Sequence, residues 1–296
     1  GRLREEFESL PGHDLLAAFR RLADAGVLEP IACAATHGFL PLLPDDRAIE
    51  RQLDVGLAAH ARHFGRPAKG IWIPECAYRP GGTWTSPADG HREERKGIEE
   101  FLAALGLERY SLYLQDYGGP IGFRLATRHP ERVQALILQN ANAYKEGLSE
   151  ATELLNLYWT DRAMSEPAVR ALLTRTTTTY QYTHGAQHPE RISPDAYHHA
   201  QALLDRPGND SIQLELLFDY QHHVELYPHW QTYLREHQPP ALIVWGENDP
   251  FFLPAGARAY LQDLQNAELH LLPGGHFILE EAHEEIAGLI TAFLTR

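Results

Sequence analysis

The sequence predicts an α/β protein with a parallel sheet and a helical cap, preceded by a partial β/α segment. Three observations indicate this class. Apolar runs rich in strand-forming residues recur in the second part of the chain, at residues 110–115, 133–138, 241–245 and 269–272. Stretches with helical periodicity separate these runs, and strands that alternate with helices build a parallel sheet. A helix-rich insert follows residue 138, which is typical of a cap.

Helices are expected next to each of these strands. Helical spacing of apolar residues predicts them around the sheet, at residues 98–107, 121–128, 255–264 and 280–294. The insert contains further stretches of this kind, at residues 150–159, 166–173, 194–204 and 212–220. We expect the insert to form a helical cap at about residues 140–238.

The first part of the chain has a shorter pattern of its own. Two helices and two apolar runs alternate in it, at residues 14–25, 30–35, 47–64 and 70–74. Residues 79–97 are rich in Pro, Gly and charge, which predicts a loop or linker. The prediction is therefore two segments: a partial β/α segment at residues 1–97, and the sheet with its cap at residues 98–296.

The composition excludes several classes of protein. The 296 residues include 26 Lys and Arg against 40 Asp and Glu, and the net charge of -14 argues against a nucleic-acid partner. No run of about 18 apolar residues predicts a membrane span. Cys33 and Cys76 form neither a disulfide framework nor the spacing of a zinc site, which is typical of a cytoplasmic protein. We expect no metal and no cofactor.

A candidate nucleophile stands where the first strand of the sheet meets its helix. Residues 113–119 (YLQDYGG) have the form of a tight strand-to-helix turn with Asp116 at its apex. No G-x-S-x-G motif occurs in the sequence, which disfavours a serine esterase. The helix that follows stabilises the Asp116 anion, and a carboxylate can attack carbon to give an ester intermediate.

Hydrolysis of such an ester requires a base, and two later strand ends supply the residues. His276 lies in a Gly-Gly-His-Phe sequence directly after the strand at 269–272, and Asp249 follows the strand at 241–245. An acid beside the histidine would orient it. The chain order is nucleophile, acid, base, which is the order described for α/β-hydrolases.

Four short motifs carry a resemblance to a known family. They are residues 115–119 (QDYGG), 128–133 (RHPERV), 245–249 (WGEND) and 275–277 (GHF). On these motifs, residues from about 98 to 296 resemble the haloalkane dehalogenase and epoxide hydrolase branch of the α/β-hydrolases. The resemblance implies that Asp116 is the nucleophile, His276 the base and Asp249 its partner. It also implies that the backbone N–H of Tyr117 is one oxyanion donor, with a small apolar molecule and water as reactants.

The group that would stabilise the leaving group stays open. Dehalogenases of this branch usually carry Trp after the nucleophile to hold the halide, and this chain has Tyr117 there. Epoxide hydrolases use two cap tyrosines, but the sequence does not select a pair among Tyr158, Tyr180, Tyr182, Tyr197 and Tyr220. We take Trp159, Tyr180 and Tyr182 as cap candidates for substrate contact, with packing inside the cap as the alternative role.

The first segment resembles a different family. Residues 14–20 (DLLAAFR), 33–43 (CAATHGFLPLL) and 70–80 (GIWIPECAYRP) are similar to the catalytic region of glycoside hydrolase family 57, which includes α-glucan branching enzymes. The resemblance implies that Glu75 is a glycosidic nucleophile and that His37 lines the sugar site. The second carboxylate that a retaining glycosidase needs lies beyond the matching region. His37 and Gly38 also imitate the signal that supplies a second oxyanion donor in α/β-hydrolases.

Three hypotheses about function follow from these resemblances. The first is a hydrolase that uses Asp116 to open a carbon–halogen or epoxide bond through an ester. The second is a fragment of an α-glucan-acting glycoside hydrolase or branching enzyme, with Glu75 and His37 in its site. The third is a truncated fusion without activity. The sequence does not predict the substrate or the oligomeric state.

Overall fold

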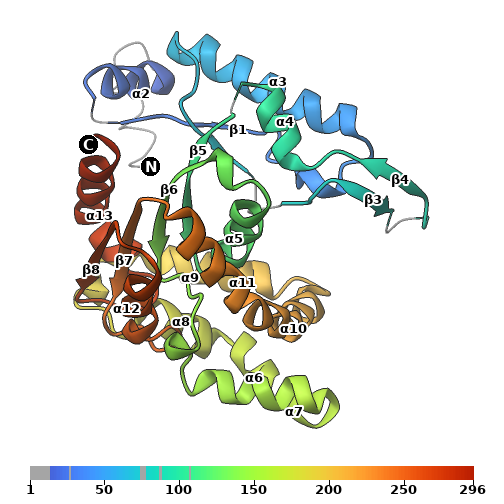
Figure 1. Ribbon diagram of the computed structural model, residues 1–296, viewed down its shortest axis with the longest axis vertical. Helices are drawn as coiled ribbons and strands as arrows, with labels where there is room; N and C mark the ends of the chain where they lie inside the picture. Colours follow the sequence, from blue (N-terminus) through green and yellow to red (C-terminus); the bar gives the residue numbers. More distant parts are fainter. Residues whose placement is uncertain (1–13, 27, 74–77, 87–88, 107) are drawn as a thin grey trace. The chain divides into compact units, whose positions relative to one another are not determined.

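The computed structural model describes residues 14–26, 28–73, 78–86, 89–106 and 108–296, and it divides into two compact units (Figure 1). The first unit is Gly1–Glu108 and the second is Arg109–Arg296. The sequence predicted the division at residue 97, whereas the contacts place it after the helix that follows. The physical reason is that Ile98, Phe101 and Leu102 of that helix are buried in the core of the first unit.

The first unit alternates short strands with helices. Its described elements are α2 (Leu15–Asp24), β1 (Ala32–Cys33), η2 (Leu40–Leu42), α3 (Asp46–Phe64), β2 (Ile71–Trp72), β3 (Gly82–Thr85), β4 (Arg92–Arg95) and α4 (Ile98–Ala104). Strands β1 and β2 pair in parallel. Helix α3 packs closely on β1 at Gly56, where a Cβ atom would lie 1.9 Å from the backbone oxygen of Cys33. Only glycine fits this approach.

The predicted loop at residues 79–97 is wrong in its middle, because β3 and β4 form an antiparallel hairpin there. Gly82, the first residue of β3, has a φ of 135°, a backbone conformation that favours glycine. The side chain of Arg95 is buried and donates hydrogen bonds to Asp46 at 2.8 Å and to the backbone oxygen of Leu43 at 2.8 Å. These contacts hold the hairpin in place. They join residues far apart in sequence, so no local sequence pattern predicts them.

The second unit contains a four-stranded parallel sheet in the order β5-β6-β7-β8. The strands are β5 (Tyr110–Gln115), β6 (Val133–Gln139), β7 (Ala241–Gly246) and β8 (Ala267–Leu272). All four occur where the apolar runs predicted them, and the predicted fold class is confirmed. The carboxyl ends of parallel strands meet at one edge of a sheet, so the residues that follow these strands gather there.

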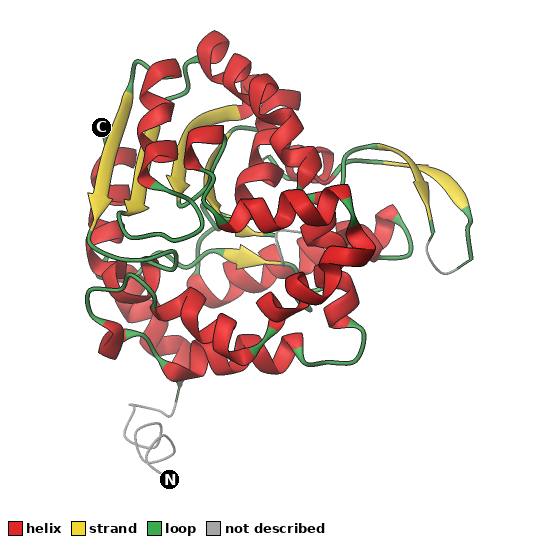
Figure 2. Cartoon of the chain, turned by 90° about the horizontal axis from the view of Figure 1, so that it is seen from below, coloured by secondary structure: helices red, strands yellow, loops and turns green. Residues whose placement is uncertain are grey.

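Helices cover both faces of this sheet (Figure 2). They are α5 (Gly118–Arg128), α11 (Gln221–His237), α12 (Pro254–Asp263) and α13 (Leu279–Leu294), with η4 (Pro130–Arg132) before β6. Leu136 and Ile243 face the core that includes α5, α11 and α12, whereas Ile137 and Leu242 face the core that includes α13. This alternation follows the two-residue period of a strand. Burial on both faces explains why β7 is a continuous apolar run and why most residues of β6 are apolar.

A set of helices follows β6 and forms the predicted cap. They are η5 (Lys145–Gly147), α6 (Ala151–Thr160), α7 (Arg162–Arg170), η6 (Ala171–Leu173), α8 (Arg175–Thr183), η7 (Pro189–Arg191), α9 (Pro194–Leu204) and α10 (Asn209–Asp219). The sequence had not indicated α11 as a separate helix. Its Tyr227, Trp230 and Leu234 are buried in the core beside the sheet, so α11 joins the cap to the base. Across the described residues, no helix combines the length and apolar character needed to cross a membrane.

Candidate active site

Asp116 stands on the sharp turn between β5 and α5. Its φ of 46° lies in the left-handed region, where a residue other than glycine is strained. Two backbone hydrogen bonds hold the turn: the Asp116 N–H donates to Asn140 O at 3.2 Å, and the Gly119 N–H donates to Asp116 O at 2.9 Å. A Cβ atom at Gly119 would lie 3.2 Å from the Cβ of Ala141, so a small residue is required there.

The structure brings the three predicted catalytic side chains together. The Nε2 atom of His276 lies 3.7 Å from Oδ1 of Asp116, and its Nδ1 atom lies 2.8 Å from Oδ2 of Asp249. His276 therefore bridges the two carboxylates, one through each ring nitrogen. With Nδ1–H donated to Asp249, Nε2 is the nitrogen that can take a proton on the side of Asp116.

Asp249 is completely buried and its carboxylate is fully paired. Its Oδ1 atom accepts the backbone N–H groups of Phe251 at 2.8 Å and Phe252 at 3.0 Å. Its Oδ2 atom accepts His276 and the side-chain amide of Asn140, which lies at 2.7 Å. Four donors compensate for the loss of water around a buried charge, so this carboxylate can remain an anion.

Asn140 is a site residue that the sequence analysis missed. It follows β6, is fully buried, and has φ 44°. Its Oδ1 atom accepts the backbone N–H of Gly246 at 3.3 Å, and its backbone oxygen accepts the N–H of Asp116. One residue thus links the turn of Asp116 to Asp249. The available signal was its place directly after Gln139, the last residue of β6, at the edge where residues that follow the strands gather.

Burial and neighbouring charges shift the pKa of both His276 and Asp116. Burial lowers the pKa of His276, but the hydrogen bond and charge of Asp249, together with the charge of Asp116, outweigh burial and raise it above the ordinary value. Burial also raises the pKa of Asp116, against the opposing charge of His276 and the backbone N–H of Tyr117. The Asp116 side chain still exposes 37% of its surface, so a substrate can reach it.

Tyr117, whose backbone N–H is the oxyanion donor predicted from the sequence, belongs to the second unit. This N–H is one of the groups that lower the pKa of the Asp116 carboxyl. The second donor suggested by the sequence, at His37 and Gly38, belongs to the first unit. There His37 has φ 55° and its Nδ1 atom lies 3.4 Å from Sγ of Cys33. His37 follows β1, which pairs in parallel with β2. Glu75 lies outside the described residues.

A pocket of about 280 Å³ lies over Asp116 and His276. Its lining also includes Tyr117, Ser149, Ala151, Thr152, Leu155, Leu172, Leu173, Gln181, Gln213, Leu217, Tyr220, Phe251, Phe252 and Phe277. Most of these side chains are apolar, and the cap helices contribute about half of the wall. An enclosed apolar pocket with a few polar groups is the usual form of a small-molecule site.

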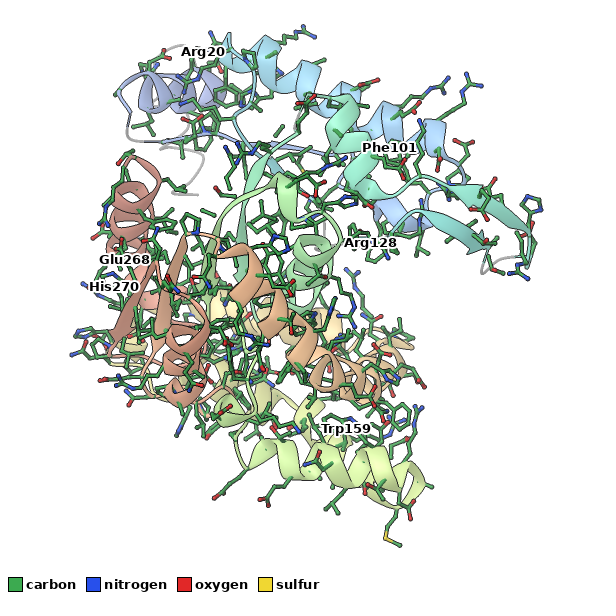
Figure 3. The ribbon with its side chains drawn as sticks, in the orientation of Figure 1. Arg20, Phe101, Arg128, Trp159, Glu268 and His270 are labelled. Atoms are coloured by element: carbon green, nitrogen blue, oxygen red, sulfur yellow. The ribbon has the colours of Figure 1, made fainter. Side chains whose placement is uncertain are left out.

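The three predicted cap candidates lie beside this pocket rather than in its wall. Trp159 lies on α6 (Figure 3), and its indole N–H is already donated to Leu217 O at 2.9 Å. Tyr180 stacks on His184 at 4.3 Å between ring centroids, and Tyr182 stacks on Phe277 at 4.1 Å. These contacts are packing, which was the alternative role for cap aromatics. The lining residue of α8 is Gln181, which the sequence analysis did not consider.

Two other tyrosines do line the pocket. The rings of Tyr117 and Tyr220 are 5.6 Å apart in an edge-to-face arrangement. The hydroxyl of Tyr220 lies 3.3 Å from that of Tyr227, which accepts the amide of Asn142. The hydroxyl of Tyr117 is buried and has no hydrogen-bond partner in the structure. Among the five cap tyrosines considered from sequence, Tyr220 is therefore the one in the pocket wall.

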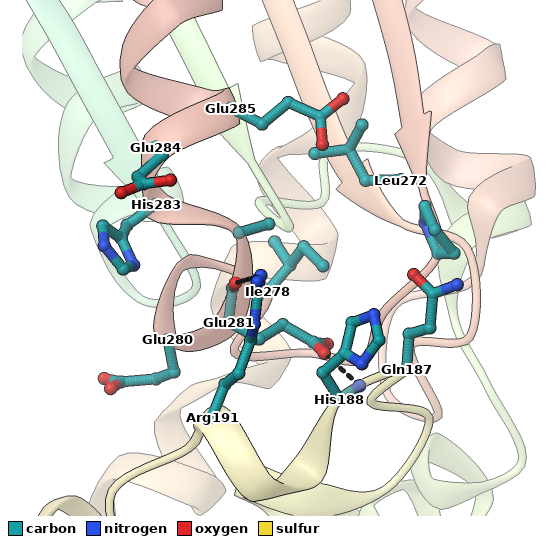
Figure 4. A pocket seen from close by; sticks show the side chains of 12 residues that line it. Gln187, His188, Arg191, Leu272, Ile278, Glu280, Glu281, His283, Glu284 and Glu285 are labelled. Carbon is teal, nitrogen blue, oxygen red and sulfur yellow. Dashed lines mark hydrogen bonds between the residues drawn. The ribbon is translucent and has the colours of Figure 1, made fainter.

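A larger cavity of about 580 Å³ lies elsewhere in the second unit (Figure 4). Acidic side chains of α13 and the loop around His188 line it, and Glu281 accepts the backbone N–H of His188 at 2.8 Å. Neither Asp116 nor His276 borders it. Within the described ranges, no three His, Cys, Asp or Glu side chains are arranged to hold a metal ion.

Comparisons with known proteins agree with both resemblances. An uncharacterized hydrolase of Saccharomyces cerevisiae is 38% identical over 190 residues, which are 62% of this chain and 66% of the yeast protein. Haloalkane dehalogenase 2 of Mycobacterium bovis is 28% identical over 67% of this chain and 68% of its own length. A 1,4-alpha-glucan branching enzyme of Thermococcus kodakarensis is 50% identical over 97 residues, which are 33% of this chain and 14% of that enzyme.

The chain therefore spans only part of each of these relatives, and a small part of the branching enzyme. Residues 95–283 match the family described as "alpha/beta hydrolase fold". This match includes the nucleophile turn, the cap and the two strand ends that carry Asp249 and His276. On the matching sequence and the sheet that it forms, the chain belongs to the alpha/beta hydrolase fold family.

Proposed function

We propose that this protein is a hydrolase that opens an epoxide or a carbon–halogen bond of a small apolar molecule, with Asp116 as the nucleophile. The observation that carries the proposal is the relay from Asp116 through His276 to Asp249, at 3.7 and 2.8 Å, at the wall of an apolar pocket. A carboxylate at the position of the nucleophile forms an ester, which water can hydrolyse.

In the first step, an oxygen of Asp116 attacks the electrophilic carbon of the substrate. A carbon–oxygen bond forms and the bond to the leaving group breaks, with its electron pair going to halide or to the epoxide oxygen. The apolar pocket strengthens this attack, because it replaces the water that would otherwise solvate the carboxylate. The strained turn and the start of α5 hold Asp116 in one position for it.

In the second step, His276 removes a proton from water, and the resulting hydroxide attacks the Asp116 ester carbonyl. The oxyanion that forms faces the backbone N–H of Tyr117. When it collapses, the product oxygen leaves with the proton held by His276, and Asp116 then loses its acid proton, to water for a haloalkane or to the tyrosine that protonated an epoxide oxygen. Ester formation removes the negative charge of Asp116, which is one of the causes that raise the pKa of His276. The pKa of His276 therefore falls when the ester forms, at the stage where a neutral base is required.

The pocket tyrosines support an oxygen leaving group in particular. An epoxide oxygen leaves as an alkoxide, which must take up a proton, whereas a halide needs only hydrogen-bond donors. A phenol can give the proton, and Tyr220 has a hydroxyl chain behind it through Tyr227 and Asn142. Burial raises the pKa of Tyr220, so it stays protonated until a stronger base forms beside it.

A second candidate function belongs to the first unit. Its likeness to an α-glucan branching enzyme, 50% identical over 97 residues, supports carbohydrate binding near His37 and Glu75. Turnover of an α-glucan that is lost in Glu75→Gln but persists in Asp116→Asn would favour this function. The reverse pattern, on an epoxide or a haloalkane, would favour the hydrolase.

A single-turnover reaction in ¹⁸O-labelled water tests the ester mechanism. With enzyme in excess over an epoxide such as 1,2-epoxyhexane, or over 1-bromohexane, the product oxygen should come from Asp116. The peptide that contains Asp116 should then gain one ¹⁸O atom, measured by mass spectrometry. Label in the product and none in Asp116 would mean that water attacks the substrate directly.

The variant His276→Gln provides the matched control. It retains the nucleophile but lacks the base, so the ester should accumulate. The chain should then gain the mass of the epoxide, or of the hexyl group that remains after bromide leaves. Asp116→Asn should show neither the added mass nor the label. If all reactive epoxides and haloalkanes leave both variants and the parent protein unmodified, the proposed function is wrong.

A further inference from the structure

Two cap glutamines line the pocket with their amides unused. Gln181 of α8 and Gln213 of α10 are both half-buried and both border the cavity over Asp116. Among the residues that the structure describes, no hydrogen-bond partner contacts either side-chain amide. Each amide offers two N–H donors and a carbonyl acceptor.

Other glutamines in this part of the chain have hydrogen-bond partners within the protein, as expected of side chains with a structural role. The amide of Gln201 donates to Leu173 O at 3.1 Å and to Asp205 at 2.7 Å, and its oxygen accepts the hydroxyl of Thr178 at 2.6 Å. Gln221 donates to Phe218 O at 2.9 Å. Half-buried polar groups are normally paired in this way. The two pocket glutamines differ because they face the space that a substrate would fill.

The packing of their helices turns both side chains toward the cavity. On α8, the neighbours of Gln181 are engaged elsewhere, since Tyr180 stacks on His184 and Tyr182 stacks on Phe277. On α10, Gln213 lies one turn before Leu217, which lines the same pocket. Both glutamines are thus fixed parts of the cap side of the wall.

The charges in the wall limit the substrate further. Among the described lining residues there is no Lys or Arg, and the ionisable groups besides the tyrosines are Asp116 and His276. The nearby Arg124 is outside the wall and donates to Pro120 O and to His223. A carboxylate or phosphate on the substrate would lie near the Asp116 anion with no Lys or Arg in the described part of the wall to offset the repulsion. An ammonium group would pair with Asp116 and block the nucleophile.

We propose that the substrate is an uncharged molecule with one polar, hydrogen-bonding end, for which a primary amide is the best match. This end binds Gln181 and Gln213 while the reactive carbon of the substrate meets Asp116. The contact between the reactive carbon and Asp116 rests on the proposed function. The apolar middle of the molecule contacts Leu155, Leu172 and Leu217. A pocket of about 280 Å³ suits a compact ligand.

Four epoxides with the same carbon chain test the selectivity. They are 1,2-epoxyhexane, 5,6-epoxyhexan-1-ol, 5,6-epoxyhexanamide and 5,6-epoxyhexanoate. We expect kcat/KM to be highest for the amide, about tenfold above the apolar epoxide, which corresponds to one added hydrogen bond of ordinary strength. The carboxylate should be the poorest substrate. A carboxylate that reacts as fast as the amide would overturn the proposal.

Glutamine variants identify the residues responsible. Gln181→Leu and Gln213→Leu should each lower the ratio of kcat/KM for the amide to kcat/KM for 1,2-epoxyhexane about tenfold. The control is Gln265→Leu, a change of the same kind at an exposed position outside the pocket, which should alter neither value. Loss of activity on all four substrates in a variant that is folded by circular dichroism would contradict the assignment.

A binding measurement separates this proposal from the proposed function. Hexanamide and hexanoate contain no epoxide, so their binding to the full chain, followed by ligand-observed NMR, does not depend on turnover. Hexanamide should bind more tightly than hexanoate, and Gln181→Leu should weaken it about tenfold. If hexanamide binds in this way while no epoxide or haloalkane reacts, the proposed function is wrong, but the binding of a polar end by Gln181 and Gln213 is supported. If hexanamide does not bind, or binds the variants equally well, the role proposed for the two glutamines is wrong.

Discussion

The side-chain amide of Asn140 donates a 2.7 Å hydrogen bond to Oδ2 of Asp249, the same oxygen that accepts the Nδ1–H of His276. Because Asn140 also accepts the backbone N–H groups of Gly246 and Asp116, one buried residue fixes the acid and the nucleophile turn together. The relay is therefore positioned from β6 as well as from the strand ends that carry its members. Three predictions follow from this relay and from the packing around it, and a fourth concerns an ion pair of the first unit.

Asn140→Gly should impair the relay without straining the backbone, since glycine accepts the φ of 44° at this position. The variant leaves Asp249 with one donor fewer and the N–H of Gly246 without its acceptor. We expect the free energy of unfolding to fall by about 1–3 kcal/mol, measured by urea denaturation, and the rate of ester hydrolysis to fall about tenfold or more. Unchanged hydrolysis would show that His276 and Asp249 need no third residue.

Asp249→Asn should lower the pKa of His276. The hydrogen bond and charge of Asp249 are the larger of the causes that outweigh burial at this histidine. The charge of Asp116 is absent in the ester, so burial then favours the neutral ring in the variant. In the parent protein, ester hydrolysis should rise with pH as His276 loses its proton. In the variant that rise should move to lower pH and end at a lower maximum rate, measured in single turnovers across pH. A rise at the same pH in both proteins would assign it to another group.

Gly275→Ala should disturb the junction between the cap and the loop of His276. A Cβ atom at Gly275 would lie 2.0 Å from the backbone oxygen of His184, so the backbone of one segment must move. We expect a loss of about 1–3 kcal/mol of stability and a raised KM. Gly288→Ala is the matched control, since a Cβ atom there meets nothing within 4 Å and α13 should gain about 0.5–1 kcal/mol.

Asp46→Asn should destabilise the first unit. It removes the carboxylate that pairs with the buried guanidinium of Arg95 at 2.8 Å and that accepts the backbone N–H of Lys96 at 3.0 Å. Asp46 is 27% exposed, so we expect a loss of about 2 kcal/mol, below that of a fully buried pair. The measurement is amide hydrogen exchange of α3 in the full chain. Glu50→Gln, which breaks an exposed pair with Lys96, should change it by less than about 1 kcal/mol.

The two central strands of the sheet could be predicted from the sequence because they are buried on both faces. Residues 241–245 are a continuous apolar run, residues 133–138 are apolar except for the exposed Gln134, and β6 and β7 each end one residue later than predicted. The same reasoning predicted the positions of Asp116, Asp249 and His276, since each follows a strand of one parallel sheet. Local pattern and chain order carry this information, so neighbours in space are not needed to find it.

The pocket wall could not be predicted in this way. Trp159, Tyr180 and Tyr182 were chosen as large aromatics, yet each has a partner within the fold, and Gln181 lines the cavity between the two tyrosines. A cap helix is covered on some sides by other helices and on one side by the cavity. Composition does not reveal which side is which.

By itself, the sequence determined the alternation of strands and helices, the two unlike segments, and the three residues at the strand ends. Only the tertiary structure decided that Asn140 joins Asp116 to Asp249, that Tyr220 is the cap tyrosine in the pocket wall, and that Gln181 and Gln213 line the same pocket. The reason is physical: strand burial and turn geometry are set by neighbours along the chain, whereas the partners of a cap side chain come from helices far away in sequence.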